Sequence, residues 1–147
     1  MGEALRRRIR QRRFDSPLQE AIVNVVVAAN YIRDRIDRAL ADLGLTSPQY
    51  NVLRILRGVH PGGHPRCEIA ARMLDRAPDV TRIIDRLEQK GLVARDRSSS
   101  DRRHSITTIT REGLRLLERL DAPMRDAIDE LKCRLTVREC RELSREE

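Results

Sequence analysis

Aromatic residues are nearly absent from this sequence: its 147 residues include one Phe, two Tyr and no Trp. So few rings exclude nucleic-acid binding that depends on stacking bases against aromatic side chains, and they require an aliphatic core. No run of about 18 apolar residues occurs, so the sequence predicts no membrane-spanning helix. Its three cysteines (Cys67, Cys133 and Cys140) are scattered and odd in number, so we predict a cytoplasmic protein without a disulfide framework.

Lysine is also rare, and nearly all of the 30 basic residues are Arg. The formal net charge is +7 and is unevenly distributed. Residues 1–13 hold six basic and one acidic residue, and residues 66–110 hold ten basic and seven acidic residues. Such a patch favours a polyanion as partner, although a compositional bias toward Arg explains the charge equally well.

Apolar residues recur at helical spacing in six stretches. The first helix begins with Ser16 as its N-cap and Pro17 as its first residue, and Gly44 ends it. Between Ile22 and Ala29 this long helix is apolar nearly all round, so we expect a partner subunit to cover it. The other helices are predicted over residues 46–57, 66–74, 78–90 and 110–131, and from residue 136 onward.

The pattern changes period after the fourth predicted helix. Residues 92–95 and 105–109 are rich in β-branched side chains and predict two short strands joined by a polar hairpin. Two short helices followed by such a hairpin are typical of a winged helix-turn-helix. The predicted fold is therefore mainly α with a small β-hairpin wing, and the helix over 66–74 is expected to bury Ile69, Ala70, Met73 and Leu74.

The second helix of a helix-turn-helix enters the major groove with its N-terminal residues at the base edges. Here the candidates for contact are Pro78, Asp79, Thr81, Arg82 and Arg86. An Arg fork matches the two acceptors of guanine, and a Thr side chain suits a thymine methyl group or a phosphate. The carboxylate of Asp79 equally suits a helix cap, and the two arginines equally suit a solvated face with ion pairs to nearby aspartates.

The hairpin adds a second set of candidates. Arginines on a narrow projecting loop suit the minor groove, where the negative potential of DNA is concentrated. An acidic residue among them suits a brace that holds one arginine in place. The wing candidates are Arg95, Arg97, Asp101, Arg102 and Arg103.

Three stretches resemble MarR-family regulators when they are taken in order. Residues 79–93 resemble the recognition helix of that family, residues 101–113 resemble its wing, and residues 45–53 resemble the start of its second helix. The resemblance implies a two-fold dimer on a pseudo-palindromic DNA site. By match to the wing motif, Asp101 is similar to the bracing acid and Arg103 to the minor-groove arginine, with Arg102 as the nearby alternative.

The resemblance also implies a domain organisation. Residues 1–15 form a basic arm and 16–147 a single domain, in which 16–44 and 111–147 dimerise and 46–110 bind DNA. Many members of the family release DNA when a small aromatic or phenolic anion binds, and others respond to cysteine oxidation. The last helix is shorter than usual in the family, and the arm is longer than its core requires.

Several alternatives stay open at this point. A protein that coats DNA through charge alone would share the same composition, and Cys67 beside Arg66 is a candidate redox sensor. The spacing of His60, His64 and Cys67 suits a metal but lacks a fourth ligand, so we predict no metal and no cofactor. No nucleophile with a paired base occurs, and we predict no enzyme.

Overall fold

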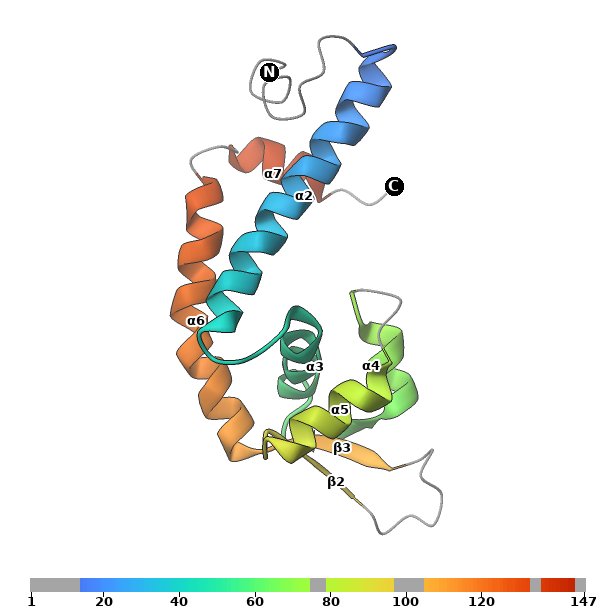
Figure 1. Ribbon diagram of the computed structural model, residues 1–147, viewed down its shortest axis with the longest axis vertical. Coiled ribbons are helices and arrows are strands. Elements are labelled where there is room, and N and C mark those ends of the chain that lie inside the picture. Colours follow the sequence, from blue (N-terminus) through green and yellow to red (C-terminus); the bar gives the residue numbers. More distant parts are fainter. Residues whose placement is uncertain (1–13, 75–78, 97–104, 133–135, 145–147) are drawn as a thin grey trace. The chain divides into compact units, whose positions relative to one another are not determined.

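The computed structural model describes residues 14–74, 79–96, 105–132 and 136–144 (Figure 1). The chain divides into two compact units, Met1–Arg35 and Ile36–Glu147, so that the boundary falls within one helix. This helix, α2, spans Pro17–Ala41. Its last part belongs to the second unit, where Leu40 is fully buried.

Both ends of α2 follow from local chemistry. The Ser16 Oγ accepts a hydrogen bond from the backbone N–H of Gln19 at 3.1 Å, which satisfies one of the free donors at the helix start. Gly44 adopts a φ of 65°, and the backbone around it is hydrogen bonded as in a Schellman turn. The two residues that predicted the limits of this helix therefore form its caps.

The second unit is built on a helical core. Its helices are α3 (Ser47–Arg57), α4 (Arg66–Arg72), α5 (Val80–Gln89), α6 (Arg111–Lys132) and α7 (Val137–Leu143). Apart from Thr107 on the sheet, the large fully buried side chains of the described residues are aliphatic and come from these helices and the end of α2, as the lack of aromatic residues requires. Among them are Leu40, Val52, Leu53, Leu56, Ile69, Leu87, Leu117 and Leu120.

The end of α4 differs from the prediction. The helix ends at Arg72, because Met73 adopts an extended conformation with ψ of 138°. The backbone N–H of Leu74 then donates to the Asn51 side chain at 2.9 Å, and the side chain of Leu74 is 88% exposed. Ile69 is buried as predicted, but the predicted burial of Leu74, and of Ala70 on the exposed side of the helix, is wrong.

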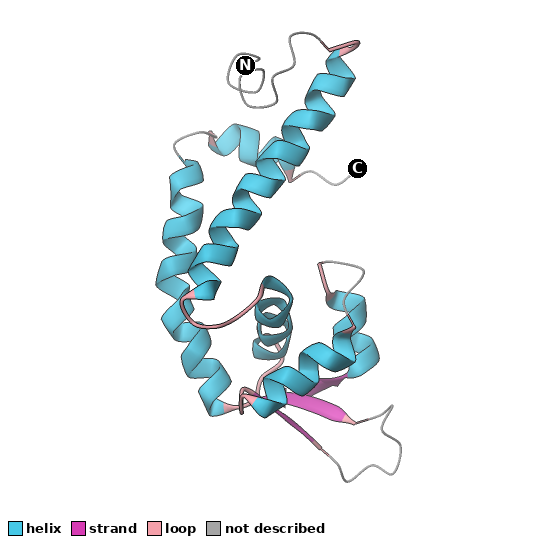
Figure 2. Cartoon of the chain, viewed as in Figure 1, coloured by secondary structure: helices cyan, strands magenta, loops and turns pink. Residues whose placement is uncertain are grey.

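A three-stranded antiparallel sheet completes the unit (magenta in Figure 2). Strands β2 (Val93–Arg95) and β3 (Ile106–Ile109) confirm the predicted hairpin, with Val93 opposite Ile109. A third strand, β1 (Gly63–Pro65), pairs with the other edge of β3 and was not predicted. The sheet order is therefore β1-β3-β2, and α3 and α4 pack against the sheet.

Close approach of the backbone explains the glycine at the start of β1. A Cβ atom at Gly63 would lie well inside van der Waals distance of the Thr107 carbonyl oxygen and of the side chains of Ile106 and Thr108. Only glycine leaves room for β3 at this point. The Gly62-Gly63 dipeptide thus marks a site of strand pairing.

One threonine joins the end of α5 to the start of α6. The Thr110 hydroxyl donates to the carbonyl oxygen of Gly91 at 2.7 Å, and it accepts from the backbone N–H of Gly113 at 3.1 Å. Gly113 itself leaves no room for a Cβ atom against the carbonyl oxygen of Leu92. A single side chain therefore caps α6 and holds it against the turn that follows α5.

No helix in the described part of the chain is both long enough and apolar enough to cross a membrane.

Candidate nucleic-acid interface

Helix α5 begins one residue after the aspartate that caps it. The Asp79 carboxylate accepts a hydrogen bond from the backbone N–H of Arg82 at 3.3 Å, and the helix runs from Val80. The capping role considered for Asp79 is therefore confirmed, and its negative charge also suits the positive end of the helix dipole. Pro78, with which we expected the helix to begin, lies outside the described residues.

The two sides of α5 have opposite character. Ile84 and Leu87 are fully buried in the core, as their spacing predicts. Arg82 and Arg86 are exposed and lie one turn apart, on one side of the helix. Within the described ranges, the side chain of neither arginine has an ion-pair partner. The aspartates that were the alternative partners are occupied, since Asp79 caps the helix and Asp85 binds elsewhere.

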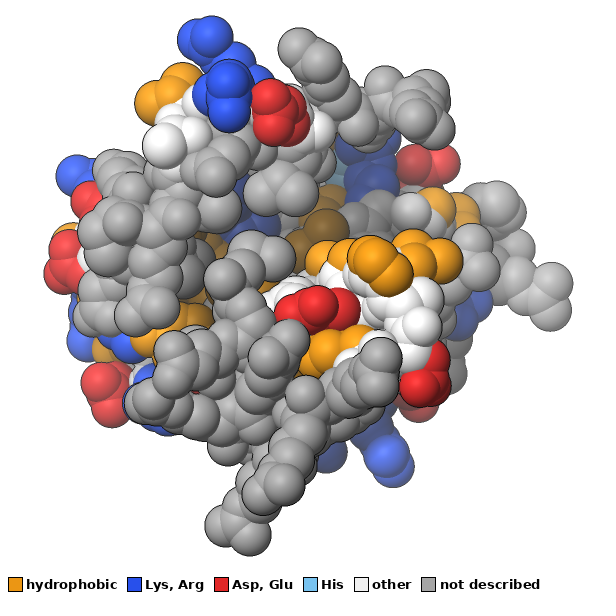
Figure 3. Space-filling view, turned by 90° about the horizontal axis from the view of Figure 1, so that it is seen from above, with side chains coloured by type: hydrophobic (Ala, Val, Ile, Leu, Met, Phe, Trp, Pro, Cys, Tyr) orange, Lys and Arg blue, Asp and Glu red, His pale blue; other side chains and the backbone are white. Residues whose placement is uncertain are grey.

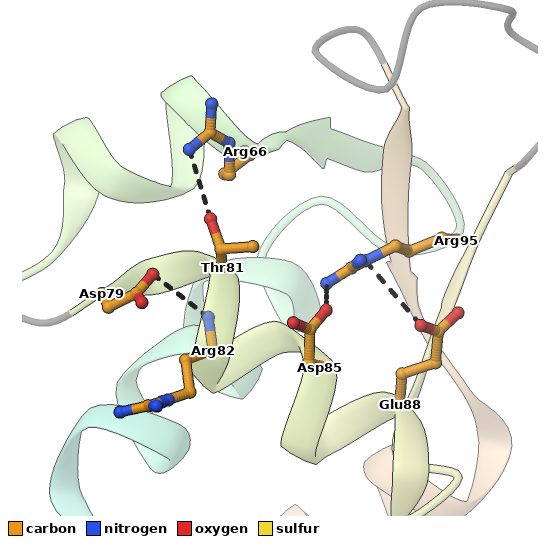
Figure 4. Close-up of polar contacts among 7 residues, drawn as sticks. All are labelled: Arg66, Asp79, Thr81, Arg82, Asp85, Glu88 and Arg95. Carbon is orange, nitrogen blue, oxygen red and sulfur yellow. Dashed lines mark hydrogen bonds and ion pairs between the residues drawn. The ribbon is translucent and has the colours of Figure 1, made fainter.

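Thr81 is held by an arginine from the preceding helix. The Arg66 Nη1 donates a hydrogen bond to the Thr81 Oγ1 at 3.2 Å (Figure 4). Arg66 is the first residue of α4, so the contact joins the two helices of the helix-turn-helix at their N-terminal ends. Since the hydroxyl oxygen accepts from Arg66, its own hydrogen remains free to be donated outward.

Arg95 lies at the end of β2 and faces α5. Its Nη2 makes an ion pair and hydrogen bond with the Asp85 Oδ1, and its Nε lies 3.9 Å from the Glu88 Oε2 (Figure 4). The Arg95 side chain is 24% exposed, much less than the outward arginines of α5. Of the five predicted wing residues, this is the one that the described residues include.

The base of the wing is closed by hydrogen bonds between its two strands. The backbone N–H of Asp96 donates to the Ile106 carbonyl at 2.9 Å, and the Ser105 hydroxyl donates to the Asp96 carbonyl at 2.7 Å. The remaining wing candidates, Arg97, Asp101, Arg102 and Arg103, lie outside the described residues.

Among the residues that the structure describes, the other reactive side chains form no recognisable site. Cys67 and Cys140 are free and exposed, so neither is a small buried hydrophobic residue. In the described ranges, no three His, Cys, Asp or Glu side chains gather closely enough to hold a metal ion, including the set of His60, His64 and Cys67.

Two features of this surface were not predicted from the sequence. Arg66 was considered only as a neighbour of Cys67, and its position beside Thr81 depends on how α4 meets α5. Asp85 and Glu88 were not linked with Arg95, although two acids at i and i+3 on an amphipathic helix were a signal for a shared cationic partner.

Known proteins resemble this chain in both sequence and structure. The family model described as MarR family matches residues 45–105. The HTH-type transcriptional repressor Rv2887 of Mycobacterium tuberculosis is 31% identical over 131 residues, which cover 89% of this chain and 91% of the relative. The HTH-type transcriptional regulator MhqR of Bacillus subtilis is 32% identical over 100 residues, 68% of each chain.

A crystal structure of a MarR transcription factor from Planctomyces limnophilus superposes with a TM-score of 0.72 at 38% identity, covering 89% of this chain and 95% of that one. Two further structures share the fold at lower identity. They are the Staphylococcus aureus MepR–DNA complex (TM-score 0.70, 21% identity, 81% and 87% covered) and CouR from Rhodococcus jostii RHA1 bound to p-coumaroyl-CoA (TM-score 0.74, 24% identity, 88% and 90% covered).

Proposed function

Because the chain belongs to the MarR family of transcriptional regulators, we propose that it is a homodimeric repressor that binds a pseudo-palindromic site in double-stranded DNA. The observation that carries this proposal is the exposed arginine pair of α5. Arg82 and Arg86 project from a helix whose other side is fixed in the core, and the hairpin of β2 and β3 follows directly. A rigid helix with a free cationic side suits the major groove. No enzymatic activity is part of this proposal.

We assign base reading to Thr81 and Arg82. The Arg82 fork would contact the O6 and N7 atoms of a guanine, and the Thr81 hydroxyl, oriented by Arg66, would donate to a base or phosphate acceptor. Arg86, one turn further along, would contact the phosphate backbone. Asp79 contributes by setting where the helix begins, and its carboxylate is not assigned a contact with DNA.

For the wing we retain the assignment made from the sequence. Arg103, braced by Asp101, would enter the minor groove, with Arg102 as the alternative, and Arg97 remains a further wing candidate. Residues 1–15 would add further phosphate contacts. The part of the chain that we propose for DNA binding is 46–110.

We propose that residues 16–44 and 111–147 form the dimer interface. Large hydrophobic side chains are open on α2, where Leu18 is 70%, Ile22 55%, Val25 66% and Val26 53% exposed. Hydrophobic side chains also appear on the face seen in Figure 3. A monomer that exposed such a stripe would aggregate, and a second copy of the chain would bury it.

The repressor assignment is supported by the Mycobacterium tuberculosis relative, which is named a transcriptional repressor. CouR, which shares the fold, is bound to p-coumaroyl-CoA in its structure, and this supports a small aromatic anion as the effector class here. We propose that such an effector releases the DNA. We also retain a cytoplasmic location as part of this proposal.

The test is a selection of binding sequences from a random duplex pool by the full-length protein at physiological salt. A repressor will enrich one two-fold symmetric sequence and bind it roughly 10³-fold or more tightly than random DNA. The expected stoichiometry is two chains for each duplex. The competing function, a protein that coats DNA through charge alone, would enrich no sequence and bind all duplexes alike.

Once a sequence is selected, the effector class can be tested separately. Salicylate and p-coumarate, added to the protein without DNA, are expected to raise its melting temperature, because a bound ligand stabilises the folded state by mass action. The same compounds should release the selected duplex. Benzyl alcohol, which has the ring but no carboxylate, serves as the control.

A further inference from the structure

The base of the wing carries a cluster of three charged side chains that bridges two elements. Arg95 ends β2, and its guanidinium meets Asp85 and Glu88, which lie almost one turn apart on α5 (Figure 4). We call these three residues the wing clamp. Neither of the acidic residues is part of the predicted DNA-contact set, and Arg95 was included in it only because of its charge.

The charges of the wing clamp argue against a contact between Arg95 and DNA. Two carboxylates lie against the same guanidinium, so a phosphate group would have to compete with both of them for Arg95. The side chains of Arg95 and Glu88 are 24% and 26% exposed, so Arg95 is already partly removed from solvent. Freeing Arg95 for a phosphate would break its ion pair with Asp85 beside the DNA surface, which is unfavourable.

The position of the wing clamp suggests what it does instead. Arg95 is the last residue of β2, and the following residue, Asp96, makes the last described hydrogen bond of the hairpin with Ile106. The clamp therefore fixes the strand to the side of α5 at the point where the chain leaves toward the wing tip. An Arg fork that meets two carboxylates restrains direction as well as distance.

We infer that Arg95 is a positioning residue that, with Asp85 and Glu88, sets the direction of the wing relative to α5, and that it makes no contact with DNA. This inference deepens the proposed function and rests on it. A duplex presents its major and minor grooves at a fixed spacing, so α5 and the wing bind together only when their relative direction is right. The clamp would provide that direction before DNA arrives.

The first measurement uses the free protein and needs no DNA. Amide hydrogen exchange is compared in wild type, Arg95→Gln and Asp85→Asn. We expect faster exchange at the Asp96 N–H in both variants, while the amides of Ile84 and Leu87 in the core of α5 exchange as in wild type. Unchanged exchange at Asp96 would overturn the inference.

The second measurement uses the selected duplex over a range of salt concentrations. We expect Arg95→Gln and Asp85→Asn each to weaken binding about tenfold, and the double variant to be no weaker than Arg95→Gln, because both break one interaction. The slope of log affinity against log salt should stay at the wild-type value. A direct phosphate contact by Arg95 would instead lower that slope by about 0.9, and Asp85→Asn would then tighten binding.

Arg138→Gln is the matched control. Arg138 also pairs with an acid, Glu142, but the pair is confined to α7 and is exposed. This variant removes one positive charge and one ion pair without changing the wing, so exchange at Asp96 should remain at the wild-type rate. If wild type selects no sequence while the clamp variants still speed exchange at Asp96, the proposed function fails and the positioning role of the clamp stands.

Discussion

Arg82 and Arg86 differ from the other described arginines of the DNA-binding part in having an open side chain on a helix whose other side is held in the core. The opposite side of α5 is fixed by Ile84 and Leu87 in the core, and Asp79 fixes its first turn. Because the backbone of such a helix is already ordered, an arginine on it loses only side-chain freedom when it meets a base. The specificity of the protein should therefore depend on individual side chains of α5 more than on its overall charge.

The change Arg82→Ala is expected to cost about 1 to 3 kcal/mol on the selected duplex and to remove the preference for guanine at one position of each half-site. The reason is that a bidentate contact with the guanine edge distinguishes that base, whereas a phosphate contact does not. Titrations of the selected duplex, single-position variants of it and random DNA measure the effect. Arg103→Ala, in the wing, should weaken binding to all duplexes alike. Equal losses on selected and random DNA for both variants would contradict this division.

At the scale of elements, the clearest dependence on a single residue is the edge strand β1. Gly63 is the point at which β1 and β3 come too close for any side chain. The change Gly63→Ala should destabilise the protein by about 1 to 3 kcal/mol, because β1 must move away from the sheet. Thermal or urea unfolding followed by circular dichroism measures this.

The control for this change is Gly58→Ala. Gly58 has a helical φ of −63°, and a Cβ atom there meets its nearest neighbour at an ordinary 3.4 Å. The free energy of unfolding of the Gly58→Ala variant should be unchanged or slightly raised, since alanine restricts the unfolded chain. If the two variants melted alike, close strand approach would not be the reason for glycine at position 63.

The helices were predictable because their signals are local. Ser16 and Gly44 mark the ends of α2, and the apolar spacing of α5 gave its buried side correctly. Strand β1 was not predictable in the same way, because its three residues include a proline and its partner β3 lies some forty residues further along the chain. Pairing at that separation leaves no periodic trace in a short segment.

The same distinction applies to the candidate DNA-binding surface. The side chains that face outward from α5 could be identified from the helical period alone. The contacts of Arg66 with Thr81 and of Arg95 with Asp85 depend on how neighbouring elements pack. Sequence therefore identified which residues carry charge toward this surface, but could not separate those that are open from those that are already paired.

At the scale of the whole molecule, the exposed hydrophobic stripe of α2 leads to a prediction about assembly. The double change Ile22→Glu with Val26→Glu should convert a dimer into a monomer of 17.0 kDa, because buried like charges would face each other across the interface. Light scattering or sedimentation measures the mass. The side chains of Ile22 and Val26 are both more than half exposed in a single chain, so these changes should not lower the melting temperature of an isolated monomer.

The control for the assembly prediction is Arg38→Glu, an exposed position of the same helix that lies on the side opposite the apolar stripe. Its mass should remain that of the dimer. The monomeric variant should bind the full duplex only as weakly as it binds a single half-site, because each lobe then binds alone. A dimer that persists in the double variant would place the interface on another surface.

The hydroxyl of Thr110 has a mechanical consequence for such a dimer. It joins the turn after α5 to the first turn of α6, and the close contact of Gly113 with Leu92 leaves no slack between them. A helix that belongs to the proposed dimer interface is thus directly joined, through the Thr110 side chain, to the end of the helix proposed to read DNA. We therefore expect a shift of α6 to move α5 with it, so that contacts far from the DNA can change the spacing of the two DNA-reading helices in the dimer.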